Sequence, residues 1–347
     1  MSNLSKEIFK KILTNRSKKL PPGKNLPKYD EIISMNKEVS TALSQDPILL
    51  ELEGKFVVCG DIHGDVDDLI RVFEMKGYPP KTKYIFMGDY IDRGNYSIEV
   101  LMILFSLKVM YKNSIYLLRG NHECDSMATG YGFKNDCFRK LNRACYKSFL
   151  EVFHNLPVAA ILGKKIMCVH GGITKSINSI YDLKKFKKSY DIPMKGAIAD
   201  LLWSDPDASV ESTFPSPRGV GCIFGVKELN NFLQKNKLEM IVRSHESCDN
   251  GYDYPFPNSK KLITIFTVCD YCDESNKGAI LDITEDQKYS IIEINMLSKK
   301  QLKKRRVIFP DWLIETKKPM KEIESDDVVN NDIVKMRLKE EDVLISV

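Results

Sequence analysis

Polar side chains that can bind metal ions stand directly after three short apolar runs of the chain. Asp61 and His63 follow the first run, Asp89 follows the second, and Asn121 follows the third. They offer carboxylate, imidazole and amide oxygen, a ligand set that suits manganese, iron or zinc better than metals that prefer thiolates. Glycines flank each group and let the backbone turn sharply beside a bound ion. The three groups therefore predict a metal site.

The elements that must position these side chains follow from the hydrophobic pattern. The apolar runs at 56–59, 84–87 and 115–118 are short and β-rich, which predicts buried strands. The segments between them, 67–76 and 96–111, carry apolar residues at helical spacing. Two successive βαβ units make the three strands parallel, so their carboxyl ends meet at one edge of the sheet. Ligands of open α/β sheets collect at that edge.

Two further histidines stand in the same kind of context. His170 follows an apolar run at 165–169 and His245 follows one at 239–243. Of the five histidines in the chain, only His154 lies outside such a place, and we expect it at a helix end or on the surface. One such motif alone is a structural turn as often as a ligand. Five polar groups in one context favour a shared site.

These motifs resemble those of a known enzyme family. Residues 60–64, 88–94, 118–123 and 170–172 are similar to the motifs of the phosphoprotein phosphatases. This metal-dependent serine/threonine group includes the type-1, type-2A, calcineurin and type-5 enzymes. The resemblance runs from about Asp46 to about Asp282, and the long second and third motifs are specific to this group among metallophosphoesterases.

The resemblance and the later strands together imply a fold. β-rich runs at 239–243, 262–269 and 278–283, with a last edge at 290–294, predict a second, antiparallel sheet facing the first. The expected fold class is α/β, a central β-sandwich of two mixed sheets flanked by helices, as in calcineurin-like metallophosphoesterases. We expect one long helix at 135–153, a hairpin at 158–169, a loop at 211–219 and a helix at 227–237.

The resemblance also implies a binuclear centre. Asp89, on the middle motif, is the natural bridge between two ions, because ions about 3.5–4 Å apart need one shared ligand. By resemblance, Asp61 and His63 complete the ligand set of the first ion, and Asn121, His170 and His245 complete that of the second. The ions are expected to be manganese in isolated protein, with iron or zinc possible in the cell. Their charge makes hydroxide available near neutral pH for direct attack on phosphorus.

The remaining site residues have expected roles in proton transfer and phosphate binding. His122 is placed to protonate the serine or threonine alkoxide, and Asp92 to orient that imidazole. Arg93 and Arg218 can bind phosphate oxygens, and by resemblance Tyr271 and Asn121 face the phosphate. Alternatives remain open: Asp92 and Arg93 could pair at a turn, Arg218 could be a surface loop residue, and His122 could act indirectly.

Three segments depart from the family pattern, and one of them is 173–175, which lacks the acidic-proline pair usual after the fourth motif. Asp65 stands where the family usually has glutamine. Val268, Cys269 and Asp270 replace an alanine, a proline and an asparagine before Tyr271. The added carboxylate of Asp270 could weaken binding of substrate or toxin, so inhibitor sensitivity is open while the metal chemistry is unaffected.

Composition limits the other function classes. The 347 residues carry a formal net charge of +5 without one long basic face, which does not suggest nucleic acid. No apolar run is long enough to cross a bilayer. Nine scattered cysteines suggest reduced thiols and a cytoplasmic or nuclear protein. The expected partners are phosphoprotein substrates and a separate regulatory subunit.

The motif spread predicts one catalytic domain with appended ends. We expect an N-terminal arm and helical segment at 1–52, with 1–28 loosely packed, the catalytic domain at 53–295 and a basic tail at 296–347. The basic run 299–306 favours a solvated tail over a nuclear-import or acidic-partner patch, or a docking segment. Residues 306–309 also resemble a short peptide by which regulators dock on type-1 phosphatase.

Two competing functions share parts of this pattern. Dinucleoside polyphosphate hydrolases and phosphodiesterases on the same scaffold share the first motifs, but are not expected to carry residues 201–206 or 218–219. A catalytically silent scaffold would not need every ligand and acid to be present.

Overall fold

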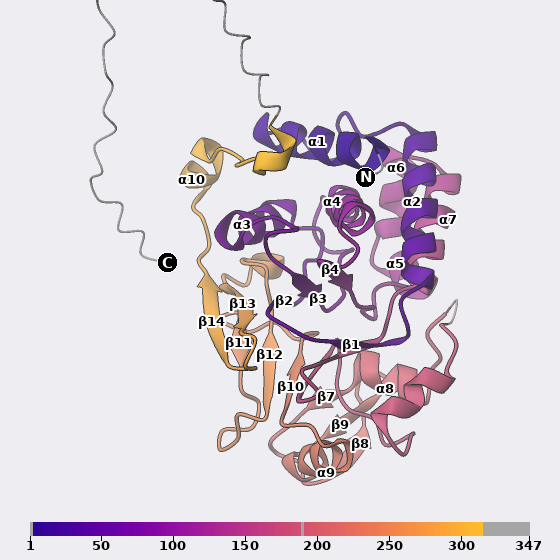
Figure 1. Cartoon of the computed structure of the whole chain (residues 1–347), viewed down its shortest axis with the longest axis vertical. Coiled ribbons are helices and arrows are strands. Elements are labelled where there is room, and N and C mark those ends of the chain that lie inside the picture. The colour runs from indigo at the N-terminus through magenta and orange to yellow at the C-terminus, as the bar shows by residue number, and fades with distance from the viewer. Residues whose placement is uncertain (1–2, 189–190, 315–347) are drawn as a thin grey trace, which may run out of the picture.

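The structure is a computed structural model that describes residues 3–188 and 191–314. The first sheet contains the three predicted parallel strands, β2 (Phe56–Cys59), β3 (Tyr84–Phe86) and β4 (Ile115–Leu117). β13 (Gly278–Ile283) pairs antiparallel with β2, and β14 (Tyr289–Ile294) forms the outer edge. The parallel core is as predicted, whereas the strand expected at 290–294 is the outer edge of this first sheet and not of the second (Figure 1).

The second sheet is mixed, and the expectation that it is antiparallel is wrong. Its order is β1 (Leu49–Leu52), β5 (Ala159–Leu162), β6 (Ile166–Val169), β10 (Met240–Arg243), β12 (Leu262–Ile265) and β11 (Tyr252–Asp253). β5 and β6 form the predicted antiparallel hairpin, but β10 runs parallel to both β6 and β12. The long connections before and after β10 allow the crossovers that parallel pairing requires. The run at 278–283 joined the first sheet instead.

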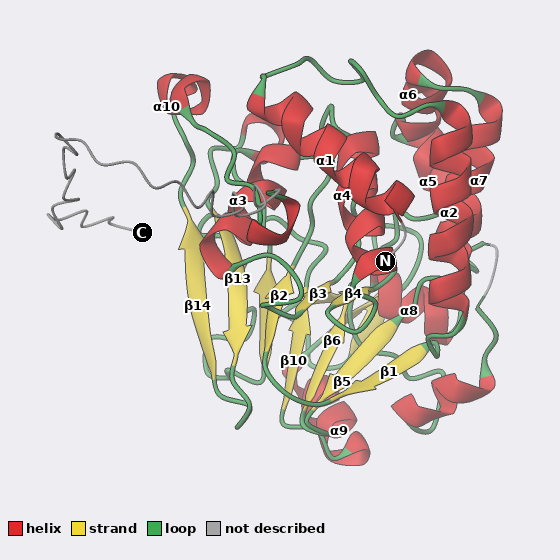
Figure 2. Ribbon diagram, turned by 45° about the horizontal axis from the view of Figure 1, so that its top comes forward, coloured by secondary structure: helices red, strands yellow, loops and turns green. Residues whose placement is uncertain are grey.

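The two sheets pack face to face around a dry layer. Buried side chains from the first sheet, such as Val58 and Ile85, meet Cys168, Val242 and Ile263 from the second. α3 (Val66–Lys76) and α4 (Ser97–Met110) cover the other face of β2–β4 (Figure 2). The fold class is therefore the expected sandwich of two mixed sheets flanked by helices.

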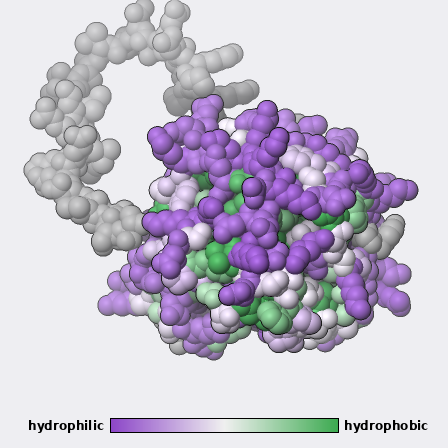
Figure 3. All heavy atoms as spheres, turned by 90° about the horizontal axis from the view of Figure 1, so that it is seen from below, coloured by the Kyte–Doolittle hydropathy of each residue, from purple (hydrophilic) through white to green (hydrophobic). Residues whose placement is uncertain are grey.

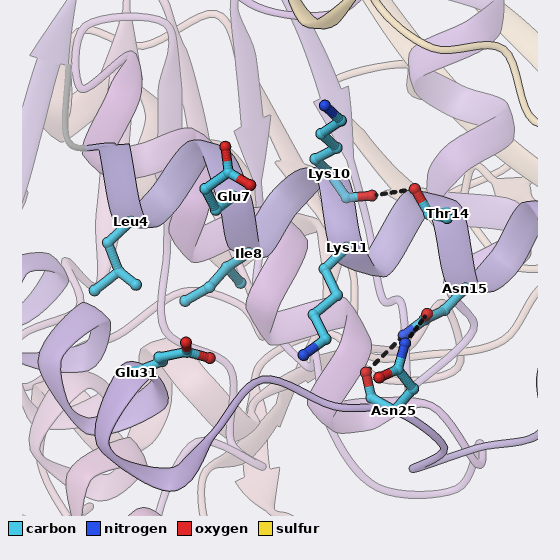
Figure 4. A pocket seen from close by; sticks show the side chains of 9 residues that line it. All are labelled: Leu4, Glu7, Ile8, Lys10, Lys11, Thr14, Asn15, Asn25 and Glu31. Atoms are coloured by element: carbon cyan, nitrogen blue, oxygen red, sulfur yellow. Dashed lines mark hydrogen bonds between the residues drawn. The ribbon is translucent and has the colours of Figure 1, made fainter.

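The N-terminal residues differ from the loosely packed arm that we expected. α1 (Asn3–Ser17) packs along α4, and its Ile8, Phe9, Ile12 and Leu13 are buried. The apolar residues recur at i, i+1, i+4 and i+5, an amphipathic pattern that the many lysines of this segment obscured. A hollow of about 450 Å³ lies between α1 and the start of α2, where Asn25 donates to Asn15 (Figure 4).

The helical segments after the N-terminus also refine the predictions. α2 (Tyr29–Ser44) packs against α4 and α7 (Arg143–His154), whereas 49–52 is strand β1. The single helix expected at 135–153 is two helices, α6 (Phe133–Lys140) and α7, preceded by α5 (Asp125–Gly130). Asn142 ends the continuity because its side chain caps α7, accepting the N–H of Cys145 at 2.9 Å. His154 is the last residue of α7, as expected.

The long connection between β6 and β10 of the second sheet carries short elements. These are η1 (Ile180–Lys185), α8 (Ala197–Trp203), β7 (Asp205–Pro206), β8 (Thr213–Pro215), β9 (Cys222–Phe224) and α9 (Val226–Asn236). β8 lies inside the expected loop at 211–219, because it pairs with β9 in a small third sheet. α9 confirms the predicted helix.

Residues 305–314 also differ from the solvated tail that we expected. After α10 (Lys299–Lys304), Val307 and Leu313 are buried against the core, and η3 (Asp311–Leu313) brings Trp312 onto Phe9 at 5.3 Å between ring centroids. Arg305 pairs with Glu74 of α3. The rest of the predicted tail, 315–347, lies outside the described residues, and the domain boundaries at 52 and 295 stay a prediction.

The surface is mostly hydrophilic (Figure 3), in agreement with the negative mean hydropathy of the chain, −0.26. Hydrophilic residues dominate the face shown in Figure 3, with apolar patches between them. Among the described residues, no helix has the length and apolar character needed to cross a membrane.

Candidate active site

The predicted metal ligands come together where strands of both sheets end. Asp61 and His63 follow β2, Asp89 follows β3, and Asn121 lies after β4. The second sheet contributes two histidines, one after β6 and one after β10: His170 and His245. Two groups of potential ligand atoms each lie within 4.8 Å of one another: His63 with Asp89 and His122, and Asp89 with His170 and His245. Asp61 lies 3.6 Å from His63, and Asn121 lies 2.7 Å from His170. All six predicted ligands therefore share one site.

Unusual backbone geometry turns these side chains toward one another. His63, Asp89 and His245 have φ values of 41°, 51° and 76°, in the left-handed region that side chains other than glycine rarely adopt. Gly88 lets the second and third motifs touch, because a Cβ there would lie 2.2 Å from the backbone nitrogen of Gly120. Such strain persists only where the surrounding structure enforces it, and it is typical of functional sites.

The first group of ligand atoms presents lone pairs to a common point. His63 donates from Nδ1 to the carbonyl oxygen of Ile91 at 2.8 Å, so its Nε2 is free to accept. That Nε2 lies 3.4 Å from an oxygen of Asp89 and 3.6 Å from an oxygen of Asp61. Burial lowers the pKa of His63 to about 3, which keeps the ring neutral. Acceptors converging without a donor between them fit a cation.

The second group has the same character. His170 Nδ1 donates to the carbonyl oxygen of Met87 at 3.1 Å, which leaves Nε2 as an acceptor. That Nε2 lies 2.7 Å from Asn121 Oδ1, 3.1 Å from His245 Nδ1 and 3.4 Å from Asp89. With the Asn121 oxygen facing them, these atoms are all acceptors, and a cation between them would satisfy them; the opposite orientation of the amide would instead direct its N–H groups at Asp89, His170 and His245.

Asp89 connects the two groups. Its Oδ2 faces His63 and its Oδ1 faces His170, as a bridging ligand requires. Burial and the nearby Asp89 raise the pKa of Asp61 to about 6, so positive charge at this point would stabilise the pair of carboxylates. The donor set, its burial and its converging lone pairs fit two cations. The residues do not identify the metals.

Two residues to which we had assigned no role hold the ligands in place. Glu123 accepts the N–H groups of Asp89, Tyr90 and Gly120 at 2.8–2.9 Å, and burial and Asp89 raise its pKa to about 7. Ser244 accepts the N–H of Asp61 at 2.9 Å and donates to its side chain. Glu123 ends the third motif and Ser244 directly precedes His245, yet their backbone partners depend on the packing of distant loops.

His122 forms the pair predicted with Asp92. His122 Nδ1 donates to Asp92 Oδ2 at 2.7 Å, and the other oxygen of Asp92 accepts the N–H of Phe133 at 2.9 Å. Both side chains are buried, and His122 Nε2 lies 3.9 Å from Asp89. Burial lowers the pKa of His122, but Asp89 and Asp92 together outweigh burial, so the net pKa is raised. The ring is therefore held beside the ligand cluster in a form that can donate a proton.

The predicted phosphate-binding residues lie beside this cluster, each in contact with one of its residues or with a neighbour of one. Arg93 is exposed and stacks on Tyr131 at 4.3 Å, rather than pairing with Asp92. Tyr271 stacks on His63, with 5.2 Å between ring centroids. Arg218 lies on an exposed loop but is held at 2.6 Å by Asp205, whose other oxygen lies 3.9 Å from His245.

Arg243 is a further buried residue that sequence reasoning missed. Its guanidinium is fully buried and bonds the carbonyl oxygen of Gly171, Asp205 and Glu246 at 2.6, 2.8 and 2.6 Å. It therefore ties the loop after His170 to the residue that holds Arg218. The sequence signal that could have identified it is its position, an arginine between an apolar strand and the predicted ligand His245.

Two of the departures from the family pattern have different structural consequences. Asp65 caps α3, accepting the N–H of Asp68 at 2.8 Å, and is not part of the ligand cluster. Asp270 is exposed in a left-handed conformation, directly before Tyr271. The consequence of its charge for substrate or toxin binding stays a prediction.

Comparisons with known proteins agree with this geometry. Residues 54–249 match the family model of the calcineurin-like phosphoesterases. The chain is similar to a protein serine/threonine phosphatase from Saccharomyces cerevisiae, itself described as similar to human PP5. Identity is 31%, coverage 79% of this chain and 92% of that chain, and the TM-score 0.74. A cold-active protein-tyrosine phosphatase from Shewanella, at 16% identity, 72% and 83% coverage and a TM-score of 0.50, shows the fold alone.

Proposed function

Because the chain belongs to the calcineurin-like phosphoesterase family, we propose that it is a protein serine/threonine phosphatase. The observation that carries the proposal is the buried His122–Asp92 pair beside the six predicted ligands, four of them in the two groups of ligand atoms and two, Asp61 and Asn121, in contact with these groups. Hydrolysis of a serine or threonine phosphoester releases an alkoxide, which needs a proton donor at this position. The 31% identity to the yeast phosphatase supports the same substrate class.

The chain's own residues would divide the work as follows. Asp61, His63, Asp89, Asn121, His170 and His245 would hold two metal ions. Such a pair, when bound, supplies positive charge for the phosphate and a water made acidic enough to attack it. His122 donates its proton from Nε2 to the leaving oxygen, while Asp92 fixes the ring through Nδ1 and stabilises its charged form.

Arg93 and Arg218 bind the non-bridging oxygens of the phosphate in this proposal. Arg218 is oriented by Asp205, and Arg93 is supported by Tyr131, so each guanidinium keeps free donors for an anion. Tyr271 closes the same side of the opening over His63. Phosphoproteins are the proposed substrates, and regulation is proposed to come from a separate chain.

The substrate class can be tested by parallel assays with added manganese. A phosphoserine peptide, diadenosine tetraphosphate and bis-p-nitrophenyl phosphate should be compared at equal concentration. The proposal expects the peptide to be hydrolysed with the highest kcat/KM. A preference for the dinucleotide or the diester would replace it with one of the two competing hydrolase functions, and loss of all three activities would favour a silent scaffold.

The ligand assignment can be tested by removing the shared carboxylate. Asp89→Asn should lower both metal content and activity, because one oxygen of Asp89 faces each ligand group. Metal analysis of purified protein measures this directly. Asp270→Asn, an exposed change outside the ligand cluster, is the matched control and should keep its metal. Full metal content in Asp89→Asn would contradict the bridging role.

A further inference from the structure

A hollow lined by lysines lies at the end of the first sheet opposite the metal ligands. It has a volume of about 230 Å³ and lies between the start of β2, the end of α3, the start of β3 and the end of β13. Its lysines are Lys55, Lys76, Lys81 and Lys83, and Asp282 is the single acidic residue that lines it. We call these residues the lysine pocket.

Most of the positive charge of this pocket is uncompensated. Asp282 pairs with Lys76 at 2.6 Å. Lys55, Lys81 and Lys83 are exposed, and none of the three forms an ion pair with any residue in the described parts of the chain. Three ammonium groups around one hollow repel one another. An anion bound there would therefore reduce this repulsion and also be attracted to each ammonium group.

The backbone that carries these lysines is fixed. The carbonyl oxygen of Lys83 accepts the N–H of Val57 at 2.9 Å, which joins the start of β3 to β2. The N–H of Lys81 donates to Tyr78 at 3.1 Å, and the hydroxyl of Thr82 donates to Lys76 at 2.6 Å. Trp312 donates to Pro79 at 2.9 Å and supports the same turn. A fixed backbone reduces the ordering needed when a ligand binds.

We propose that the lysine pocket is a docking site for an acidic polypeptide segment of a partner protein. Its three lysines without an ion pair, of which Lys83 lies over the ring of Phe56 at 5.7 Å, match a short run of Asp or Glu residues. A nucleic acid would need a longer basic track and stacking aromatic rings, whereas Phe56, the aromatic residue lining the pocket, is buried.

The position of the pocket leaves the active site accessible. Lys55 precedes β2 and Asp61 follows it, and six residues of extended chain span roughly 20 Å. A segment bound here would hold a substrate or a regulatory subunit on the phosphatase without covering the metal ligands. The binding itself does not rest on the proposed enzymatic function.

The test uses the full-length protein and a fluorescein-labelled hexaglutamate peptide, measured by fluorescence anisotropy. Lys55, Lys81 and Lys83 are changed together to Glu. The matched control changes Lys227, Lys235 and Lys237 of the α9 region to Glu, which gives the same change in net charge. The pocket variant should bind at least about tenfold more weakly, and the control within about threefold of the unchanged protein.

Further arms separate the alternatives. Asp89→Asn should still bind the peptide, and the pocket variant should hydrolyse a phosphoserine peptide at the unchanged rate. Changing the three lysines to Gln guards against misfolding and should give a smaller loss of binding. Equal loss in the pocket and control variants, loss in Asp89→Asn, no binding by the unchanged protein, or tighter pocket-dependent binding of a single-stranded oligonucleotide would each overturn the proposal.

Discussion

Replacing Asp92 with asparagine should slow turnover while the metal content stays unchanged. Asp92 is 2% exposed, and its Oδ2 accepts from His122 at 2.7 Å. A hydrogen bond to a charged partner contributes about 1.5–3 kcal/mol. That bond favours the protonated form of His122, which is the form that can donate, so its loss should lower the protonated fraction, and with it kcat, by roughly 10–150-fold. The amide oxygen of asparagine can still accept the N–H of Phe133, so the local backbone should be kept.

The assay is steady-state hydrolysis of a phosphoserine peptide, with metal analysis of the same samples. His122→Asn alone should lower kcat by about 10²–10⁴-fold. Because Asp92 acts through His122, the double variant should be no slower than His122→Asn. A double variant in which the two losses multiply would refute this reasoning. So would near-normal turnover of Asp92→Asn with its metal content intact.

Three other changes test parts of the fold. Phe9→Ala should lower the free energy of unfolding, measured by urea titration, by about 3–5 kcal/mol, because Phe9 of α1 is fully buried. A loss below about 0.5 kcal/mol would instead support the loosely packed arm expected from the sequence. Arg243→Lys should cost about 2–3 kcal/mol in the same assay, because an ammonium cannot replace three directed bonds, and an unchanged midpoint would contradict this. Burial lowers the pKa of Lys188 from 10.5 to about 8, so the unfolded chain binds more protons between these values and stability should rise with pH there. Lys188→Met should flatten that rise, and identical pH profiles would count against it.

The sequence predicted the catalytic strands well because their signal is local. Each of β2, β3 and β4 is a short apolar run that ends at a glycine and a polar ligand, and the helical segments between them force parallel pairing. The same local reasoning failed for α1 and for residues 305–314. The many lysines of these segments lie on the solvent-facing side and make the segments look exposed. The contribution of Phe9 and Trp312 to the core becomes visible only in the structure, where their rings pack together.

By itself, the sequence determined the ligand types, the order of the motifs along the chain and the family to which they belong. Tertiary structure alone decided how those side chains meet. It set which oxygens of Asp89 face His63 and His170, and how Glu123 and Ser244 hold the ligand loops. It also set how the guanidinium of Arg243 keeps Asp205 beside His245. The physical reason is that the identity of a ligand is a property of one residue. Its orientation depends on hydrogen bonds and packing between segments far apart in the chain.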